Sequence, residues 1–93
     1  MGLVRVGVRY EGRVQGVGFR ATAHQLAVGR PVSGWVRNLR DGGVEVEAQG
    51  DEAEVAAFLH SIRLALGGKI HSAAESPLVV DPDEPGDGFA IRL

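Results

Sequence analysis

The sequence predicts an α+β fold in which two helices pack on one face of an antiparallel β-sheet. Three observations support this fold class. Several segments alternate apolar and polar residues as half-buried strands do, two segments repeat apolar residues at helical spacing, and together they follow the order βαββαβ with a further strand at the end. The chain has 93 residues without a linker or low-complexity segment, so residues 1–93 are expected to form a single domain.

The first strand and the first helix flank a glycine-rich stretch. Residues 3–11 are predicted to form a strand, because apolar side chains fall at every second position from Val4. Residues 19–28 carry apolar side chains at helical spacing and contain neither Gly nor Pro, which indicates a helix. Gly29 and Pro31 are expected to end it.

A β-hairpin is predicted next. Residues 32–38 return to strand character, and residues 40–43, Arg-Asp-Gly-Gly, have the composition of a hairpin turn. Residues 43–49 form the partner strand, since apolar side chains alternate there with Glu45, Glu47 and a glutamine. One face of this strand is therefore expected to be buried and the other to be acidic.

The second helix begins with a recognisable N-terminal signal. Asp51, followed three residues later by Glu54, forms a capping box of the Asp type, and Gly67 and Gly68 are expected to end the helix. Its apolar stripe comprises Val55, Phe58, Leu59, Ile62 and Leu66.

The last quarter of the chain is the least regular. Within residues 69–80 we expect a strand around Ile70 and a separate extended piece at residues 78–80. Residues 81–88 are expected to form a polar loop, and residues 88–93 alternate again and should add a final strand to the sheet.

The glycine-rich stretch at residues 12–20 has the features of an anion cradle. It places Gly12, Gly16 and Gly18 between a strand and a helix, where glycine lets successive N–H groups turn toward one anion. Arg20 would add a planar fork that can hold two phosphate oxygens. The alternative is a glycine-rich turn followed by a surface arginine. A P-loop is excluded, because its Lys and hydroxyl residue are absent.

The order of elements places Asn38 near this stretch. The order βαββαβ is that of the split-βαβ, ferredoxin-like architecture. Its first two strands run in the same direction, so the glycine-rich stretch and the end of the second strand lie at the same edge of the sheet. The third strand separates them by about two strand spacings, roughly 10 Å, which suits a phosphate with its attacking water. Taken alone, Asn38 is more often a turn residue beside a hairpin.

Composition disfavours several other functions. A net charge of -2 creates no field for a polyanion, and the third strand carries no aromatic residue on which RNA bases could stack, so nucleic acid is not expected as a partner. The chain has no cysteine, and His60 and His71 have no partner at metal-ligand spacing, so no metal site is expected. No stretch approaches the length of a membrane span. A cytoplasmic monomer is the simplest expectation.

Two motifs carry a family resemblance. The stretches Gly12-x-Val14-Gln15-Gly16-Val17-x-Phe19-Arg20 and Gly34-Trp35-Val36-x-Asn38-x-x-Asp41-Gly42-x-Val44-Glu45 resemble the two signature motifs of the acylphosphatases. Both are long, and they stand in the expected order and separation over about the first half of the chain. The second half resembles the family only in its pattern of one amphipathic helix and a final strand.

The resemblance implies a metal-independent hydrolase without a cofactor, which cleaves the carboxyl-phosphate bond of acyl phosphates. The catalytic residues would be Arg20, which matches the family's phosphate-binding arginine, and Asn38, which matches its water-orienting asparagine. The phosphate-binding loop would comprise Gln15, Gly16, Val17, Gly18, Phe19 and Arg20.

Two further expectations concern ligands. Phosphate or sulfate should bind the same loop and inhibit competitively, while the side chain of Gln15 should have a structural role. The alternative function is a regulatory domain that binds a small anion without converting it. Nothing in the sequence forms an obvious pocket for a particular acyl group.

Overall fold

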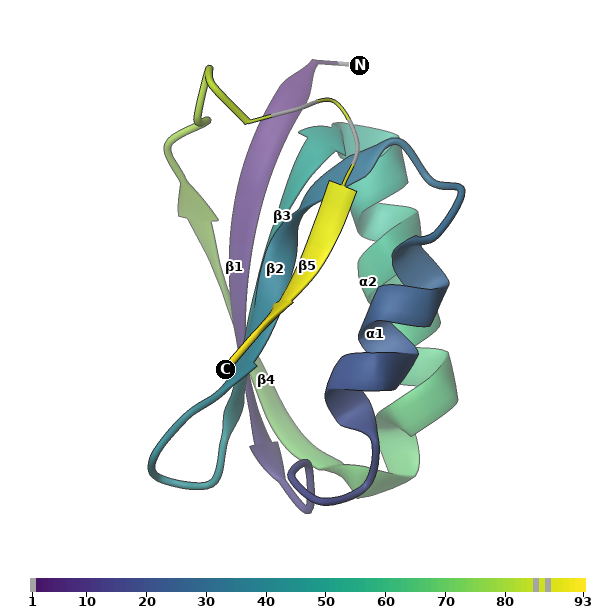
Figure 1. Cartoon of the computed structure of the whole chain (residues 1–93), viewed down its shortest axis with the longest axis vertical. Coiled ribbons are helices and arrows are strands. Elements are labelled where there is room, and N and C mark those ends of the chain that lie inside the picture. The colour runs from purple at the N-terminus through teal and green to yellow at the C-terminus, as the bar shows by residue number, and fades with distance from the viewer. Residues whose placement is uncertain (1, 85, 87) are drawn as a thin grey trace.

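The computed structural model describes residues 2–84, 86 and 88–93. Figure 1 shows the predicted alternation of strands and helices, followed by the additional C-terminal strand. The elements are β1 (Leu3–Gly12), α1 (Phe19–Ala27), β2 (Val32–Asn38), β3 (Val44–Asp51), α2 (Glu52–Leu66), the 3₁₀ turn η1 (Gly67–Lys69), β4 (Ile70–Leu78) and β5 (Gly88–Arg92). The loop predicted for residues 81–88 includes residues 85 and 87, which lie outside the described residues.

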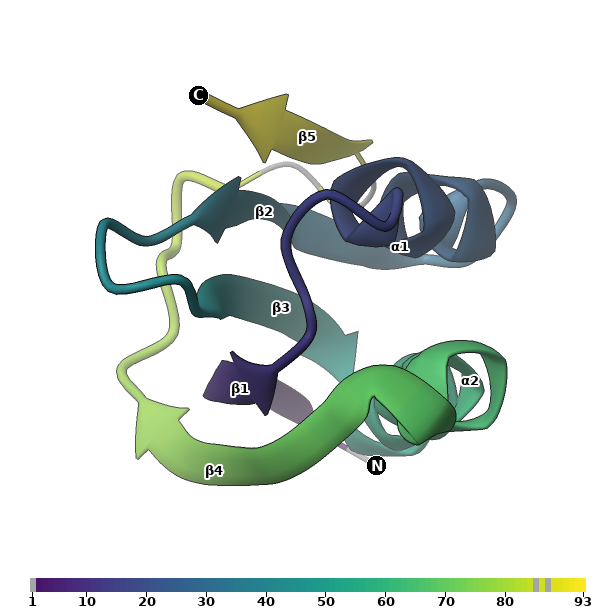
Figure 2. The same ribbon diagram turned by 90° about the horizontal axis from the view of Figure 1, so that it is seen from below.

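The five strands form one sheet in the order β4-β1-β3-β2-β5. The pairs β1–β3, β1–β4 and β2–β3 are antiparallel, whereas β5 pairs in parallel with β2. The sheet is therefore mixed, and only its first four strands form the antiparallel sheet expected from the sequence. Both helices cover the same face, as Figure 2 shows, so the predicted α+β ferredoxin-like arrangement is confirmed.

The region of residues 69–80 differs from the sequence-based expectation. It forms the single nine-residue strand β4 instead of two short pieces. β4 pairs with β1 from Leu78 opposite Arg5 to Ser72 opposite Glu11, where the register shifts. Most of β4 is exposed at the edge of the sheet. The sequence of an exposed edge strand shows little alternation of apolar and polar residues, so the extent of β4 was not visible in it. The length of β4 is determined by its hydrogen bonds to β1.

The core lies between the sheet and the two helices. Phe58 of α2 is fully buried and meets Phe89 of β5 edge-to-face, with ring centroids 5.0 Å apart. Phe19 of α1 packs against Tyr10 of β1 at the same centroid distance. Burial raises the pKa of the Tyr10 hydroxyl, and the carboxylate of Glu75 raises it further. These ring contacts fix β5 and the start of α1 to the same core.

The chain crosses the open face of the sheet on its way from β4 to β5, as Figure 2 shows. The side chain of Gln49 holds this crossing: its Nε2 donates to the Asp81 carbonyl at 2.9 Å, and its Oε1 accepts from the Asp81 N–H at 2.8 Å. Arg5 donates to Gln49 and to Glu47 and lies 3.7 Å from Glu84. This polar network attaches residues 81 and 84, which follow β4, to the open face of the sheet.

The first prediction concerns the core contact that holds β5. Replacing Phe58 with Ala should lower the free energy of unfolding by about 3–5 kcal/mol, because a fully buried ring leaves a cavity. The matched control is Leu64→Ala, a truncation on the same helix at a side chain that is 74% exposed, which should change stability by less than about 0.5 kcal/mol. Urea unfolding curves of both variants measure this difference, and equal losses would contradict the assignment of the core.

Candidate active site

The loop between β1 and α1 contains two glycines in a left-handed conformation. Gly16 has φ 77°, and Gly18, the N-cap of α1, has φ 78°. A side chain at either position would meet open space, so the requirement for glycine comes from the backbone angle alone. The first turn of α1 carries no acidic side chain and receives no side-chain cap. The N–H groups at the start of α1 therefore face a position where an anion is favoured.

A pocket of about 300 Å³ opens at this point. It joins the glycine loop and α1 to the ends of β2 and β5. Its lining residues are Val14, Gly16, Gly18, Phe19, Arg20, Ala21, Asn38, Ile91 and Leu93. The fold thus brings Arg20 and Asn38, which are 18 positions apart in the sequence, to one cavity. Gln15 and Val17 belong to the loop but do not line the pocket.

Arg20 supplies the positive charge of the pocket. Its Nη1 donates to the carbonyl of Arg92 at 3.2 Å, so the guanidinium is held against β5. Within the described part of the chain, no carboxylate lies at ion-pair distance from Arg20. A guanidinium has five N–H donors, so further donors remain for a bound oxyanion.

Asn38 faces the pocket from the end of β2. It pairs with Val44 through the backbone, directly before the turn that joins β2 to β3. Its side chain is half-buried and has no hydrogen-bond partner among residues 2–84, 86 and 88–93. A partly buried amide without a partner carries a free donor and a free acceptor for a ligand or a water molecule.

Gln15 connects the loop to the hairpin. Its Nε2 donates to the carbonyls of Leu39 and Gly43, at 2.7 and 2.8 Å. The same turn is closed by the N–H of Leu39, which donates to Gly43 at 2.8 Å. The Gln15 side chain therefore holds the glycine loop in a fixed position relative to Asn38, which agrees with the structural role expected for it. Val17 packs against the core.

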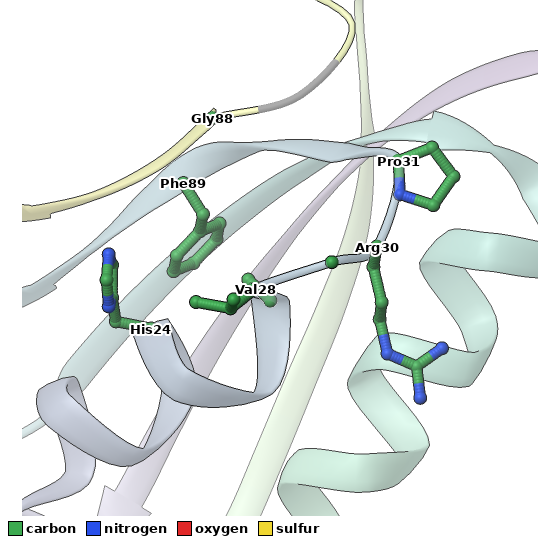
Figure 3. A pocket seen from close by; sticks show the side chains of 8 residues that line it. His24, Val28, Arg30, Pro31, Gly88 and Phe89 are labelled. Atoms are coloured by element: carbon green, nitrogen blue, oxygen red, sulfur yellow. The ribbon is translucent and has the colours of Figure 1, made fainter.

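A larger pocket, of about 430 Å³, lies at the other end of α1. Figure 3 shows His24, Val28 and Phe89 around it, while the Arg30 side chain points away toward α2. Arg30 donates to the hydroxyl of Ser61 at 3.1 Å and lies 3.8 Å from the carboxylate of Glu54. Its charge is therefore already engaged. The pocket at the N-terminus of α1 suits an anion better, although it is smaller.

The described residues provide neither a metal site nor a membrane helix. Among them, no three His, Asp or Glu side chains are grouped so that they could hold a metal ion. The described helices also fall short of the length and apolar character needed to cross a membrane.

The pocket contains residues that the sequence did not indicate. Ile91, Leu93 and the backbone carbonyl of Arg92 reach it because β5 pairs in parallel with β2. No local signal marks them, since their position depends on a contact between strands that are about fifty residues apart.

Fold and pocket together define a class: a small α+β domain with a cationic pocket at one end of its sheet. The sequence model of the family "Acylphosphatase" matches residues 6–91. An acylphosphatase from Synechococcus sp. (strain JA-2-3B'a(2-13)) is 45% identical over 89 residues, covering 96% of this chain and 93% of that protein. One from Haloarcula marismortui is 38% identical and is covered over 99% of both chains.

A solved structure agrees with these sequence relatives. The crystal structure of acylphosphatase from Bacillus subtilis superimposes with a TM-score of 0.82 at 27% identity, over 97% of this chain and 99% of that one. The chain belongs to the acylphosphatase family. This confirms the family and the enzyme class expected from the two motifs.

The second prediction tests the connection through Gln15. Gln15→Glu keeps the shape but replaces the donor with a carboxylate that faces two carbonyl oxygens, so it should lower the free energy of unfolding by about 1–3 kcal/mol. Gln25→Glu, an exposed position on α1, is the control and should change stability by less than about 0.5 kcal/mol. Urea unfolding of both variants provides the measurement. Similar stability of the two would mean that the connection contributes nothing.

Proposed function

We propose that this protein hydrolyses acyl phosphates to a carboxylate and inorganic phosphate. The observation that supports the proposal best is the position of Arg20 and the unpartnered Asn38 side chain, which line one pocket at the start of α1. The names of its relatives agree with this reaction.

In this proposal, the phosphoryl group binds at the glycine loop. The backbone N–H groups of residues 15–19 and the guanidinium of Arg20 surround its non-bridging oxygens. The Arg92 carbonyl orients Arg20, since it accepts one of its N–H bonds. Phosphoryl transfer depends mainly on positioning and on stabilisation of charge, and these groups supply both as the transition state forms.

Asn38 orients the attacking water. The oxygen of the water forms a bond to phosphorus while the bond between phosphorus and the acyl oxygen breaks, and the electron pair leaves with the carboxylate. A neutral amide is a poor base, so the proton of the water passes to the phosphate itself. The leaving carboxylate has a conjugate acid with a pKa of about 4, so the reaction needs neither a general acid nor a metal ion to stabilise it.

The oligomeric state and the location of the enzyme are also part of the proposed function. We propose that the enzyme works as a monomer in the cytoplasm, since the proposed reaction uses no group beyond the glycine loop, Arg20 and Asn38. Inorganic phosphate and sulfate resemble the phosphoryl group, and they should compete for the same donors.

An assay with benzoyl phosphate in the presence of EDTA tests the function directly. Rapid hydrolysis, inhibited competitively by phosphate, would support the enzyme. A folded protein that binds phosphate without hydrolysing benzoyl phosphate would instead be a regulatory domain for small anions, and the proposal would be wrong.

The third prediction concerns Arg20. Arg20→Ala should reduce turnover by on the order of 10³ to 10⁵, as for other arginines that stabilise phosphoryl transfer. Arg20→Lys should also fall well below the wild type, because an ammonium keeps the charge and loses the planar fork. Arg13→Lys, an exposed position in the same loop, is the matched control and should retain activity. Near-normal kcat in Arg20→Lys would show that charge alone is sufficient.

The fourth prediction separates binding from chemistry at Asn38. Asn38→Ala should reduce kcat by on the order of 10² to 10³ while the phosphate inhibition constant stays nearly the same, because the loop and Arg20 still bind the anion. Asn38→Asp should weaken both, since it places a negative charge beside a dianion. The readouts are kcat and the phosphate inhibition constant, after circular dichroism shows that each variant is folded. Retention of more than about a tenth of wild-type kcat by Asn38→Ala would exclude the water-positioning role.

A further inference from the structure

Two large apolar side chains stand exposed at the mouth of the pocket. Ile91 is 44% exposed and Leu93 is fully exposed, and both line the cavity that contains Arg20. The other large apolar residues of the lining, Val14 and Phe19, are buried and belong to the core. Ile91 and Leu93 are therefore the large apolar surface that the described pocket offers to a ligand.

These side chains flank the group that would hold the phosphate. The residue between them in the chain is Arg92, whose carbonyl accepts the hydrogen bond from Arg20 at 3.2 Å. A phosphoryl group on Arg20 would therefore lie next to them. The rest of an acyl phosphate must leave the loop toward the open side of the pocket, where this apolar surface lies.

The position of Ile91 is well fixed by the sheet. β5 pairs in parallel with β2, and Ile91 lies opposite Val36 in this register. Residues two positions apart in a strand share a face, so Ile91 lies on the side of the buried Phe89, which packs against Phe58. Isoleucine is also branched at Cβ and therefore has restricted rotamers. The Ile91 part of the surface is thus held in place before a ligand binds.

We propose that Ile91, assisted by Leu93, forms the wall that contacts the acyl group and makes the enzyme prefer acyl phosphates with an apolar body, such as aryl or branched alkyl groups. The proposal rests on the proposed hydrolysis of acyl phosphates. It assigns a specificity role, because this wall contacts the part of the substrate that inorganic phosphate lacks.

The experiment compares benzoyl phosphate with acetyl phosphate. Wild-type kcat/KM should be higher for benzoyl phosphate. Ile91→Ala should lower the ratio of the two values by about tenfold, the low end of the range for lost apolar contacts in a pocket, because Ile91 is partly exposed. Ile91→Thr, which keeps the branched shape and strand preference but not the apolar surface, should lower the ratio in the same direction. The phosphate inhibition constant should not change in either variant. Leu64→Ala removes an exposed leucine on α2 and should leave all three values unchanged.

Three other outcomes would contradict the proposed contact between Ile91 and the acyl group. An unchanged ratio in folded Ile91→Ala and Ile91→Thr would place the acyl group elsewhere. Equal losses for both substrates, with weaker inhibition by phosphate, would show that Ile91 acts by supporting Arg20. If the wild type hydrolyses neither substrate although phosphate binds, the proposed function itself fails, and the acyl wall fails with it.

Discussion

The arrangement of the pocket depends on the hydrogen bonds that Gln15 makes to the β2–β3 turn. The amide nitrogen of Gln15 donates to the carbonyls of Leu39 and Gly43. It thereby joins the loop between β1 and α1 to the turn between β2 and β3, and both segments border the pocket. The glycine loop with Arg20 lies on one side, and Asn38 lies on the other. Without this connection each segment would end in a turn that could move independently, and a catalytic geometry needs fixed distances between donors and the reacting atoms.

A second constraint acts on the open face of the sheet, which the helices do not cover. The chain must cross from β4 at one edge to β5 at the other. Gln49 pairs with Asp81 as a backbone would, because its amide nitrogen donates to the Asp81 carbonyl and its amide oxygen accepts from the Asp81 N–H. β5 then delivers the Arg92 carbonyl to Arg20. The Arg92 carbonyl thus reaches Arg20 from a strand that is held by parallel pairing with β2 and by the contact of Phe89 with Phe58.

Charge is distributed unevenly in this small protein. The formal net charge is -2, and on the open face of the sheet several arginines are paired with carboxylates: Arg5 with Glu47, Arg9 with Glu11 and Asp41, and Arg37 with Glu45. Arg20 lies apart from these pairs, beside the N-terminus of α1. The local field, and not the net charge, makes the pocket suitable for an anion.

The sequence alone determined the elements that rest on local chemistry, and with them the family. Alternation in β1 and β3, the apolar stripe of α2 and the glycines before α1 are visible because burial periodicity and special backbone angles are properties of neighbouring residues. The approach of Arg20 to Asn38 also followed from the order of elements. Tertiary structure alone decided the extent of β4, the parallel pairing of β5 and the presence of Ile91 in the pocket. An exposed edge strand shows little burial pattern, and the partner of a strand across the sheet is chosen by long-range packing and hydrogen bonds, which no stretch of neighbouring residues records.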